Sequence, residues 1–127
     1  MPDVVNAKTN FSIAKDFTIH LSDTIKQKLL DAMNLDLFEI NEAFAVQVLA
    51  FLDHFGIAED DPRVNPVGGA IAVGHPLASS GIRLMLNLAR TFEENPSIKY
   101  GITTMCIGLG MGGTVIWESA YFNGSGK

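Results

Sequence analysis

One histidine and one cysteine stand out in this sequence because each belongs to a run that is rich in glycine. His75 lies near the end of residues 65–76, NPVGGAIAVGHP, and Cys106 begins residues 106–113, CIGLGMGG. Glycine is used where the backbone turns with a positive φ or passes close to another group. Histidine exchanges protons near neutral pH, and a thiol becomes a strong nucleophile when a nearby base removes its proton. The two runs together suggest a thiol active site.

Each candidate residue also has a purely structural interpretation, and the residues alone leave both open. His75 is a general base, a hydrogen-bond donor to an oxyanion, or a structural histidine. Cys106 is a reactive thiol or a small apolar side chain before a turn. Asn41 could hold a water or a substrate oxygen, or could cap the helix that follows it. Ser79 or Ser80 begins a helix whose free N–H groups could orient charge near His75, although an ordinary cap is the simpler interpretation.

Hydrophobic periodicity predicts the elements that would position these groups. We expect strands, from alternating or continuous apolar residues, at 11–21, 35–40, 100–107 and 114–118. We expect helices at 24–33, at 43–54 and from Ser79 or Ser80 to about Glu94. The helix at 43–54 is apolar nearly all round, which predicts a buried helix. The last helix is expected to pack through a stripe of Ile82, Met85, Leu86 and Ala89. Alternating strands and helices indicate a layered α/β domain.

The composition argues against several classes of function. The chain has 127 residues, of which 47% are hydrophobic and 18% charged, enough for one domain with one core. A net charge of -5 without a Lys/Arg run argues against nucleic acid or an anionic membrane surface as a partner. A single cysteine forms no internal disulfide, and neither a signal peptide nor a membrane-spanning apolar stretch is visible. We therefore expect a cytoplasmic protein that binds no membrane.

Three blocks of the sequence resemble the C-terminal half of the thiolase family, of the acetyl-CoA acetyltransferase type. They are residues 41–45 (NEAFA), 65–81 (NPVGGAIAVGHPLASSG) and 101–113 (GITTMCIGLGMGG), and their order and spacing also agree. The resemblance implies an α/β fold, a thiolase-like C-terminal half with a layered mixed β-sheet and helices on both faces. The resemblance divides the chain into an N-terminal segment of uncertain path (1–21), the thiolase C-terminal domain (22–120) and a flexible tail (121–127).

The resemblance also implies a role for each candidate residue. His75 would activate a nucleophilic cysteine and donate a hydrogen bond to the thioester oxygen, and Asn41 would hold a water that completes this oxyanion hole. Cys106 would be the acid/base that moves a proton to or from the substrate α-carbon or the leaving thiol. The backbone N–H of Gly108 would help to form a second oxyanion hole. Acyl transfer and Claisen condensation need such a proton shuttle and such stabilised oxyanions.

By the same resemblance the substrates are coenzyme A thioesters, with no other cofactor and no metal, and Ala43 and Phe44 lie near the acyl pocket. The family's nucleophilic cysteine belongs to its N-terminal half, which this sequence does not include. We therefore expect the chain to be inactive alone and to work with an N-terminal half, or to self-associate through the apolar segment 43–52. Two alternatives are a truncated or split-gene fragment with an assembly or binding role, and a lipid-transfer relative. Leu109 replaces the glycine that is usual at its position, which affects loop shape more than chemistry.

Overall fold

The computed structural model describes residues 4–6, 18–20 and 35–124, and the chain divides into two compact units, residues 1–34 and 35–127. In the first unit β1 (Val4–Asn6) pairs with β2 (Thr18–His20) in an antiparallel arrangement. β2 falls within the strand expected at 11–21. The other residues of that expected strand, 11–17 and 21, lie outside the described part. The helix expected at 24–33 also lies outside the described residues.

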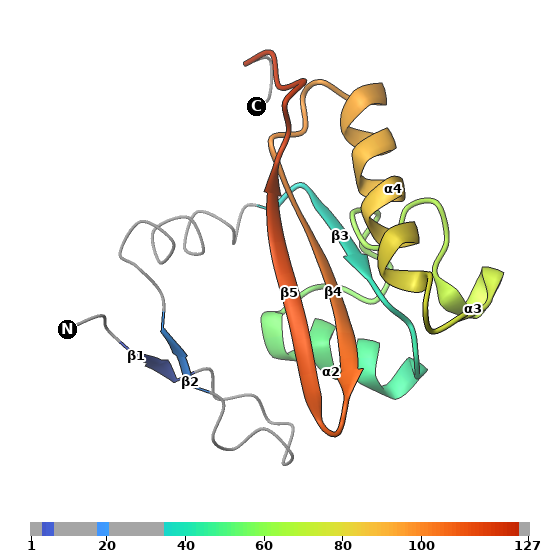
Figure 1. The fold of residues 1–127 in the computed structure, drawn as a ribbon. Helices are drawn as coiled ribbons and strands as arrows, with labels where there is room; N and C mark the ends of the chain where they lie inside the picture. Colours follow the sequence, from blue (N-terminus) through green and yellow to red (C-terminus); the bar gives the residue numbers. More distant parts are fainter. Residues whose placement is uncertain (1–3, 7–17, 21–34, 125–127) are drawn as a thin grey trace. The chain divides into compact units, whose positions relative to one another are not determined.

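Three strands of the second unit form a mixed sheet with the order β3-β4-β5 (Figure 1). β3 (Leu37–Ile40) runs parallel to β4 (Tyr100–Gly108), which pairs antiparallel with β5 (Met111–Glu118). The strands expected at 35–40, 100–107 and 114–118 are therefore confirmed, although β5 begins earlier than its apolar run. All four residues of β3 are buried, because the segment around Val64 covers its outer edge through backbone hydrogen bonds to Phe38.

One face of the sheet is covered by α4 (Ser80–Glu94), the helix predicted from Ser79 or Ser80 onward. Leu88 and Phe92 form a core with Leu37 of β3, and Gly101 of β4 lets the helix approach closely. A Cβ at Gly101 would lie 2.7 Å from Leu88 Cδ1. The predicted packing stripe is wrong, since its members are exposed on the opposite side of the helix: Ile82, Met85, Leu86 and Ala89. The helix has two apolar faces. The face that packs on the sheet consists of apolar residues four apart, Leu84, Leu88 and Phe92.

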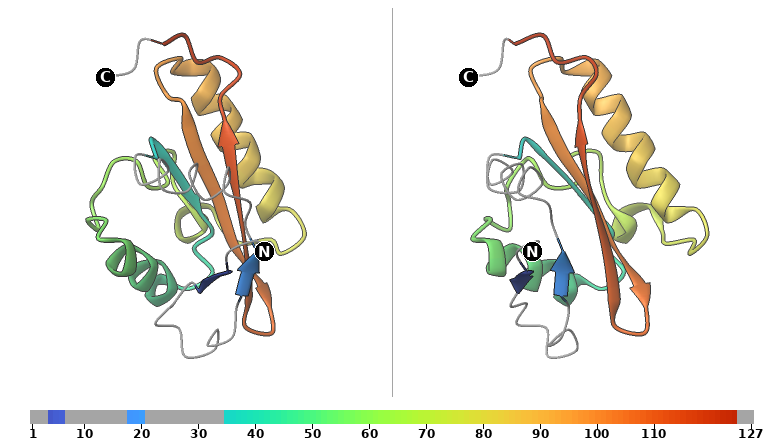
Figure 2. Two further views of the ribbon diagram at one scale, coloured as in Figure 1. Left: turned by 90° about the vertical axis from the view of Figure 1, so that its left-hand side faces the viewer. Right: turned by 60° about the vertical axis from the view of Figure 1, so that its left-hand side comes forward.

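The helix expected at 43–54 is observed as α2 (Ala45–Phe55), and it lies across the strands from α4 in both views of Figure 2. The expected mixed sheet with helices on both sides is thus confirmed. The prediction that α2 is buried all round is wrong: only Val48 and Leu52 are buried, whereas Val46 is 73% exposed. The physical reason is that the described part of the chain covers only one face of this helix. None of the helices in residues 35–124 has the length and apolarity needed to span a bilayer.

The glycine run after Cys106 forms a tight hairpin. β4 continues to Gly108, and β5 begins at Met111, so the turn contains only Leu109 and Gly110. Both turn residues have positive φ, 51° and 75°. This is the turn geometry whose twist matches two antiparallel strands, and it favours Asn-Gly.

Leu109→Asn is expected to stabilise the domain by about 0.5–1 kcal/mol, because asparagine tolerates the left-handed conformation that costs leucine about 1–2 kcal/mol. Leu109 is 99% exposed, so little packing is lost. Urea unfolding of the 127-residue chain measures the change. Ile107→Asn is the matched control, since Ile107 is also exposed but is not among the residues with positive φ. Equal effects of both substitutions would contradict the strain argument.

Candidate functional site

Two of the predicted site residues meet in a polar cluster at the end of β3. Asn41 follows β3 directly and is fully buried, and its backbone N–H donates to the carbonyl of Thr104 at 2.9 Å. Its side-chain nitrogen lies 3.3 Å from Nε2 of His75. The other ring nitrogen of His75, Nδ1, lies 2.6 Å from the hydroxyl of Ser80 at the start of α4. Two side chains, one 34 residues before His75 and one five residues after it, therefore fix the imidazole ring from its two nitrogens.

The hydroxyl of Ser80 decides where the proton of a neutral His75 ring lies. Ser80 has one proton and lies within hydrogen-bond distance of two acceptors, Nδ1 of His75 and the carbonyl of Pro76 at 3.1 Å; we assign the proton to the carbonyl. Nδ1 of His75 then donates to the Ser80 oxygen, and Nε2 keeps a lone pair that accepts from the Asn41 amide. Nε2 is therefore the atom that is able to take a proton from a third group. From the sequence, Ser80 was expected only as a possible helix start; it is indeed the first residue of α4, and its hydroxyl also contacts the ring of His75, five residues before it.

Asn65 fixes the beginning of the glycine-rich loop against the end of β3. Its side-chain oxygen accepts from the N–H of Ile40 at 2.7 Å, and its side-chain nitrogen donates to the Ile40 carbonyl at 3.0 Å. The side-chain amide of Asn65 thus pairs with the backbone of Ile40 in the way that a neighbouring strand would. Asn65 has a φ of 44°, a conformation that asparagine tolerates better than most residues. This role was not predicted from the sequence, although an Asn-Pro pair before glycines marks a turn.

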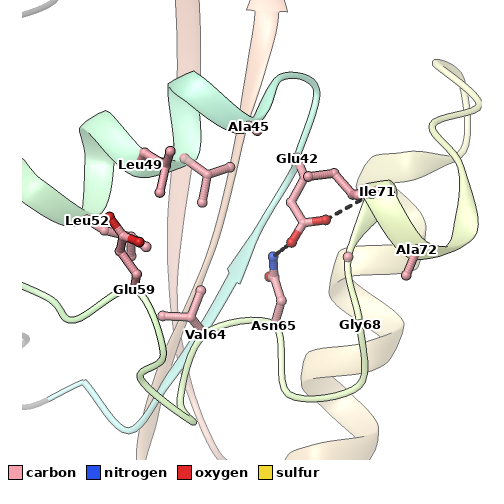
Figure 3. Close-up of a pocket in the computed structure, with 12 residues that line it drawn as sticks. Glu42, Ala45, Leu49, Leu52, Glu59, Val64, Asn65, Gly68, Ile71 and Ala72 are labelled. Carbon is pink, nitrogen blue, oxygen red and sulfur yellow. Dashed lines mark hydrogen bonds between the residues drawn. The ribbon is translucent and has the colours of Figure 1, made fainter.

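Glu42 fixes the next part of the same loop, another role that the sequence analysis missed. One carboxylate oxygen accepts from Asn65 at 2.8 Å, and the other accepts from the backbone N–H of Ile71 at 2.9 Å (Figure 3). Ile71 lies in the short helix α3 (Ala70–Val73), just before His75. Gly69 leaves the necessary space, because a Cβ there would lie within 2.3 Å of the Glu42 carboxylate. The carboxylate therefore acts as a connector between α3 and β3.

Arg63 anchors the preceding segment. Its guanidinium forms hydrogen bonds with both carboxylate oxygens of Asp61 and donates to the Leu35 carbonyl at 3.0 Å. These hydrogen bonds lower the pKa of Asp61 to about 2. The pair keeps the residues before Asn65 next to the start of β3.

The other sequence-predicted residues lie apart from the Asn41–His75 pair. Cys106 is half-buried, and no hydrogen bond joins it to either residue in the described part of the chain. Side chains alternate along a strand, and a Cβ on Gly81 of α4 would lie 3.2 Å from Met105, so Cys106 projects to the face away from α4. Gly108 is exposed at the hairpin with a φ of 115°. Phe44, at the N-terminus of α2, is 72% exposed.

A cavity of about 470 Å³ lies between α2 and the glycine-rich loop (Figure 3). Its wall is largely apolar and includes Leu49 and Leu52 of α2 and Ala72 of α3, while Glu42 and Glu59 contribute carboxylates. His75, Asn41 and Cys106 are not part of its lining. The cavity is therefore a neighbour of the polar cluster and not its centre.

Glu39, two residues before Asn41, carries a buried carboxyl group. Glu39 of β3 is fully buried, and burial raises its pKa to about 7. A hydrogen bond from Asn87 and the positive charge of Arg83 both oppose that shift, while the charge of Glu42 adds to it. Ionising Glu39 in the folded chain therefore costs free energy.

This shift predicts a pH-dependent stability. Because the folded pKa of Glu39 is about 7 and the ordinary value is 4.5, the folded chain binds more protons between these pH values. The free energy of unfolding should therefore fall by roughly 3 kcal/mol as pH rises from about 4 through the folded pKa, and this contribution should be constant above about pH 8, where Glu39 is ionised in both states. Urea unfolding across this range measures the slope. In Glu39→Gln the fall should be largely absent, and an unchanged slope would contradict the assignment.

Comparison with known proteins assigns most of the chain to one family. The model of the family "Thiolase, C-terminal domain" matches residues 6–119. Beta-ketoadipyl-CoA thiolase of Pseudomonas knackmussii is 50% identical over 91 residues, which are 68% of this chain and 22% of that protein. Beta-ketoadipyl-CoA thiolase of Acinetobacter baylyi is 48% identical over 94 residues (74% of this chain, 23% of that protein). 3-Ketoacyl-CoA thiolase of Citrobacter koseri is 44% identical over 95 residues (74% and 24%).

The chain thus spans less than a quarter of the length of these relatives. The family match nevertheless covers most of the chain and includes Asn41, His75 and Cys106. The chain therefore belongs to the thiolase family, as a C-terminal domain of that family.

Proposed function

We propose that this chain supplies one part of a thiolase active site, for thiolytic cleavage of 3-oxoacyl-CoA or the reverse Claisen condensation. The observation that carries the proposal is the contact between Asn41 and Nε2 of His75, with the ring held from the other side by Ser80. An imidazole fixed in this way can take a proton from a thiol and then donate it to a developing oxyanion.

His75 and Asn41 would act together on the thioester carbonyl. Nε2 of His75 carries the lone pair that removes the proton of the nucleophilic thiol. Once protonated, the same nitrogen donates to the oxyanion. Oδ1 of Asn41 is buried and has no hydrogen-bond partner in the part of the chain that the structure describes, which fits a role in holding a water beside that oxyanion.

Cys106 and Gly108 would act on the second half of the reaction. When the bond between the α- and β-carbons of the 3-oxoacyl thioester breaks, the acetyl-CoA enolate takes a proton from the thiol of Cys106. The thiol of coenzyme A then gives its proton to the Cys106 thiolate and attacks the acyl-enzyme, which releases the second thioester and the nucleophilic cysteine as a thiolate. The backbone N–H of Gly108 would stabilise an oxyanion in this half, and Ala43 and Phe44 would contact the acyl group. No cofactor or metal takes part in this proposed scheme.

The nucleophilic thiol must come from outside these 127 residues, since Cys106 is their only cysteine and serves as the acid/base. The exposed apolar residues of α2 fit a partner surface, either an N-terminal thiolase half or a second copy of this chain. We therefore propose that the chain alone does not turn over. A cytoplasmic location and the division into residues 1–21, 22–120 and 121–127 belong to the same proposal.

Complementation tests this function. The chain is assayed for acetoacetyl-CoA cleavage alone, and then in a chimera in which its aligned segment replaces the counterpart in the Pseudomonas knackmussii thiolase. We expect no activity for the chain alone and thiolysis by the chimera. Activity of the isolated chain would contradict the claim that its nucleophile lies elsewhere. A folded but inactive chimera would favour the alternative, a truncated or split-gene fragment with an assembly or binding role.

A further inference from the structure

A half-buried arginine is bonded to the backbone immediately before His75. Nη1 of Arg83, in α4, donates to the carbonyl of Gly74 at 2.6 Å. That carbonyl belongs to the peptide group that joins Gly74 to His75, so the guanidinium fixes the plane of this peptide. Gly74 has a φ of 92°, which residues with a Cβ rarely adopt, so glycine favours this orientation of the peptide. A charged donor makes such a bond stronger than a neutral one.

The same helix holds the ring of His75. Ser80 and Arg83 lie one turn apart on α4, and they contact the side chain and the preceding peptide of His75, respectively. Asn87 lies one turn further along the same face and donates to Glu39 at 3.3 Å. The first two turns of α4 therefore present three polar side chains to the end of β3.

Glu39 lies next to this row, with polar atoms that are unmatched. Oε1 of Glu39 and Nε and Nη2 of Arg83 are buried without hydrogen-bond partners among the residues that the structure describes. The charges of the two residues attract each other, while Glu42 is the other charged group that acts on Glu39. A buried acceptor on Glu39 and buried donors on Arg83, all without partners, fit a pair that is bridged by water.

We propose that Arg83 is a positioning residue for His75, acting through the Gly74 carbonyl, and that Glu39 is the buried counter-charge that holds Arg83 there. The proposal rests on the proposed function in that His75 transfers the proton. The orientation of the ring can be measured without any turnover.

The test uses ¹⁵N NMR of the histidine rings in the full 127-residue chain at pH 8, where Glu39 is ionised. In the wild type we expect one dominant His75 tautomer, with the proton on Nδ1. Arg83→Met should give exchange-averaged ring signals, with the two nitrogens more alike. Arg90→Met is the matched control because Arg90 lies on the exposed side of the same helix. It should leave the His75 signals as in the wild type.

Two further variants keep the proposal open to refutation if Arg83→Met does not fold. Arg83→Lys keeps the charge and one donor, and Glu39→Gln keeps the shape without the charge. Each should give His75 signals between those of the wild type and an averaged ring. His75 signals that match the wild type in the folded variants at position 83 would overturn the proposal, and the same result in Glu39→Gln would overturn the role of Glu39.

Kinetics in the chimera supply a second readout. Arg83→Met should lower kcat by roughly 10²-fold, as expected for a misplaced catalytic group, with KM within about 3-fold. Arg83→Lys should recover part of the loss. A change in KM alone would contradict the positioning role. If the chimera is inactive while the ring signals change as expected, the proposed function fails and the positioning contact stands.

Discussion

In the chimera, replacing His75 by alanine is expected to lower kcat by about 10³-fold or more, with a much smaller change in KM. The ring would serve twice, as the base for the nucleophilic thiol and as a donor to the oxyanion, and both functions are lost together. Asn41 contacts the same ring nitrogen, so Asn41→Ala should lower kcat by about 10²-fold. Steady-state thiolysis of acetoacetyl-CoA measures both effects.

His54→Ala is the control for this experiment. His54 is an exposed histidine on α2 whose ring contacts the edge of Phe55. It should leave kcat within about 2-fold, because it touches none of the groups that hold His75. A His75→Ala chimera that keeps more than a tenth of the activity would show that this ring is structural.

The second large effect is expected at Gly69. Gly69→Ala should destabilise the domain by about 2–3 kcal/mol, because the new Cβ would displace the Glu42 carboxylate, the flexible end of that side chain, from its hydrogen bonds. The carboxylate would have to leave its hydrogen bonds to Asn65 and Ile71, and these two donors would lose their partner. Since small domains are stable by only about 5–15 kcal/mol, this is a large fraction. Urea unfolding of the 127-residue chain measures it.

Gly56→Ala separates steric overlap from backbone strain. Gly56 ends α2 with a φ of 65°, and a Cβ there would meet nothing within 4 Å. Its replacement should therefore cost only about 1–2 kcal/mol, from the left-handed conformation. Gly69, by contrast, has a φ of -104° and carries no such strain. Equal losses in the two variants would contradict the idea that the Glu42 carboxylate occupies the space at Gly69.

Periodicity was sufficient to predict most elements of the second unit, because each is long or strongly apolar. It failed where an element has more than one apolar face. α4 presents Leu84 and Leu88 to the sheet and leaves Ile82 and Leu86 exposed, and both sets have helical spacing. Hydrophobicity alone does not say which face meets the sheet. α2 was expected to be buried because it is apolar all round, but burial also needs a neighbour on every side.

For the candidate site, too, some features could be predicted from the sequence and others could not. Glycine density indicated that His75 lies in a crowded place, and the structure puts Asn41 within 3.3 Å of it. The contacts of Glu42 and Asn65 could not be read from the sequence, because they join segments 23 residues apart through side chains that also suit caps and turns. Arg83 reaches the Gly74 carbonyl only because α3 and α4 enclose a turn of defined geometry. Such pairings depend on tertiary structure, which single-residue preferences do not contain.

The central claim is that His75 serves a cysteine from outside these residues and that Cys106 is the acid/base. Peptide mapping by mass spectrometry, after acid quenching of the chimera with acetoacetyl-CoA, tests this most directly. We predict that the acetyl adduct lies on a cysteine contributed by the relative's N-terminal part, that Cys106 is unmodified, and that His75→Ala prevents the adduct. An acetyl group on Cys106 in the wild-type chimera, formed at the rate of turnover, would contradict the account.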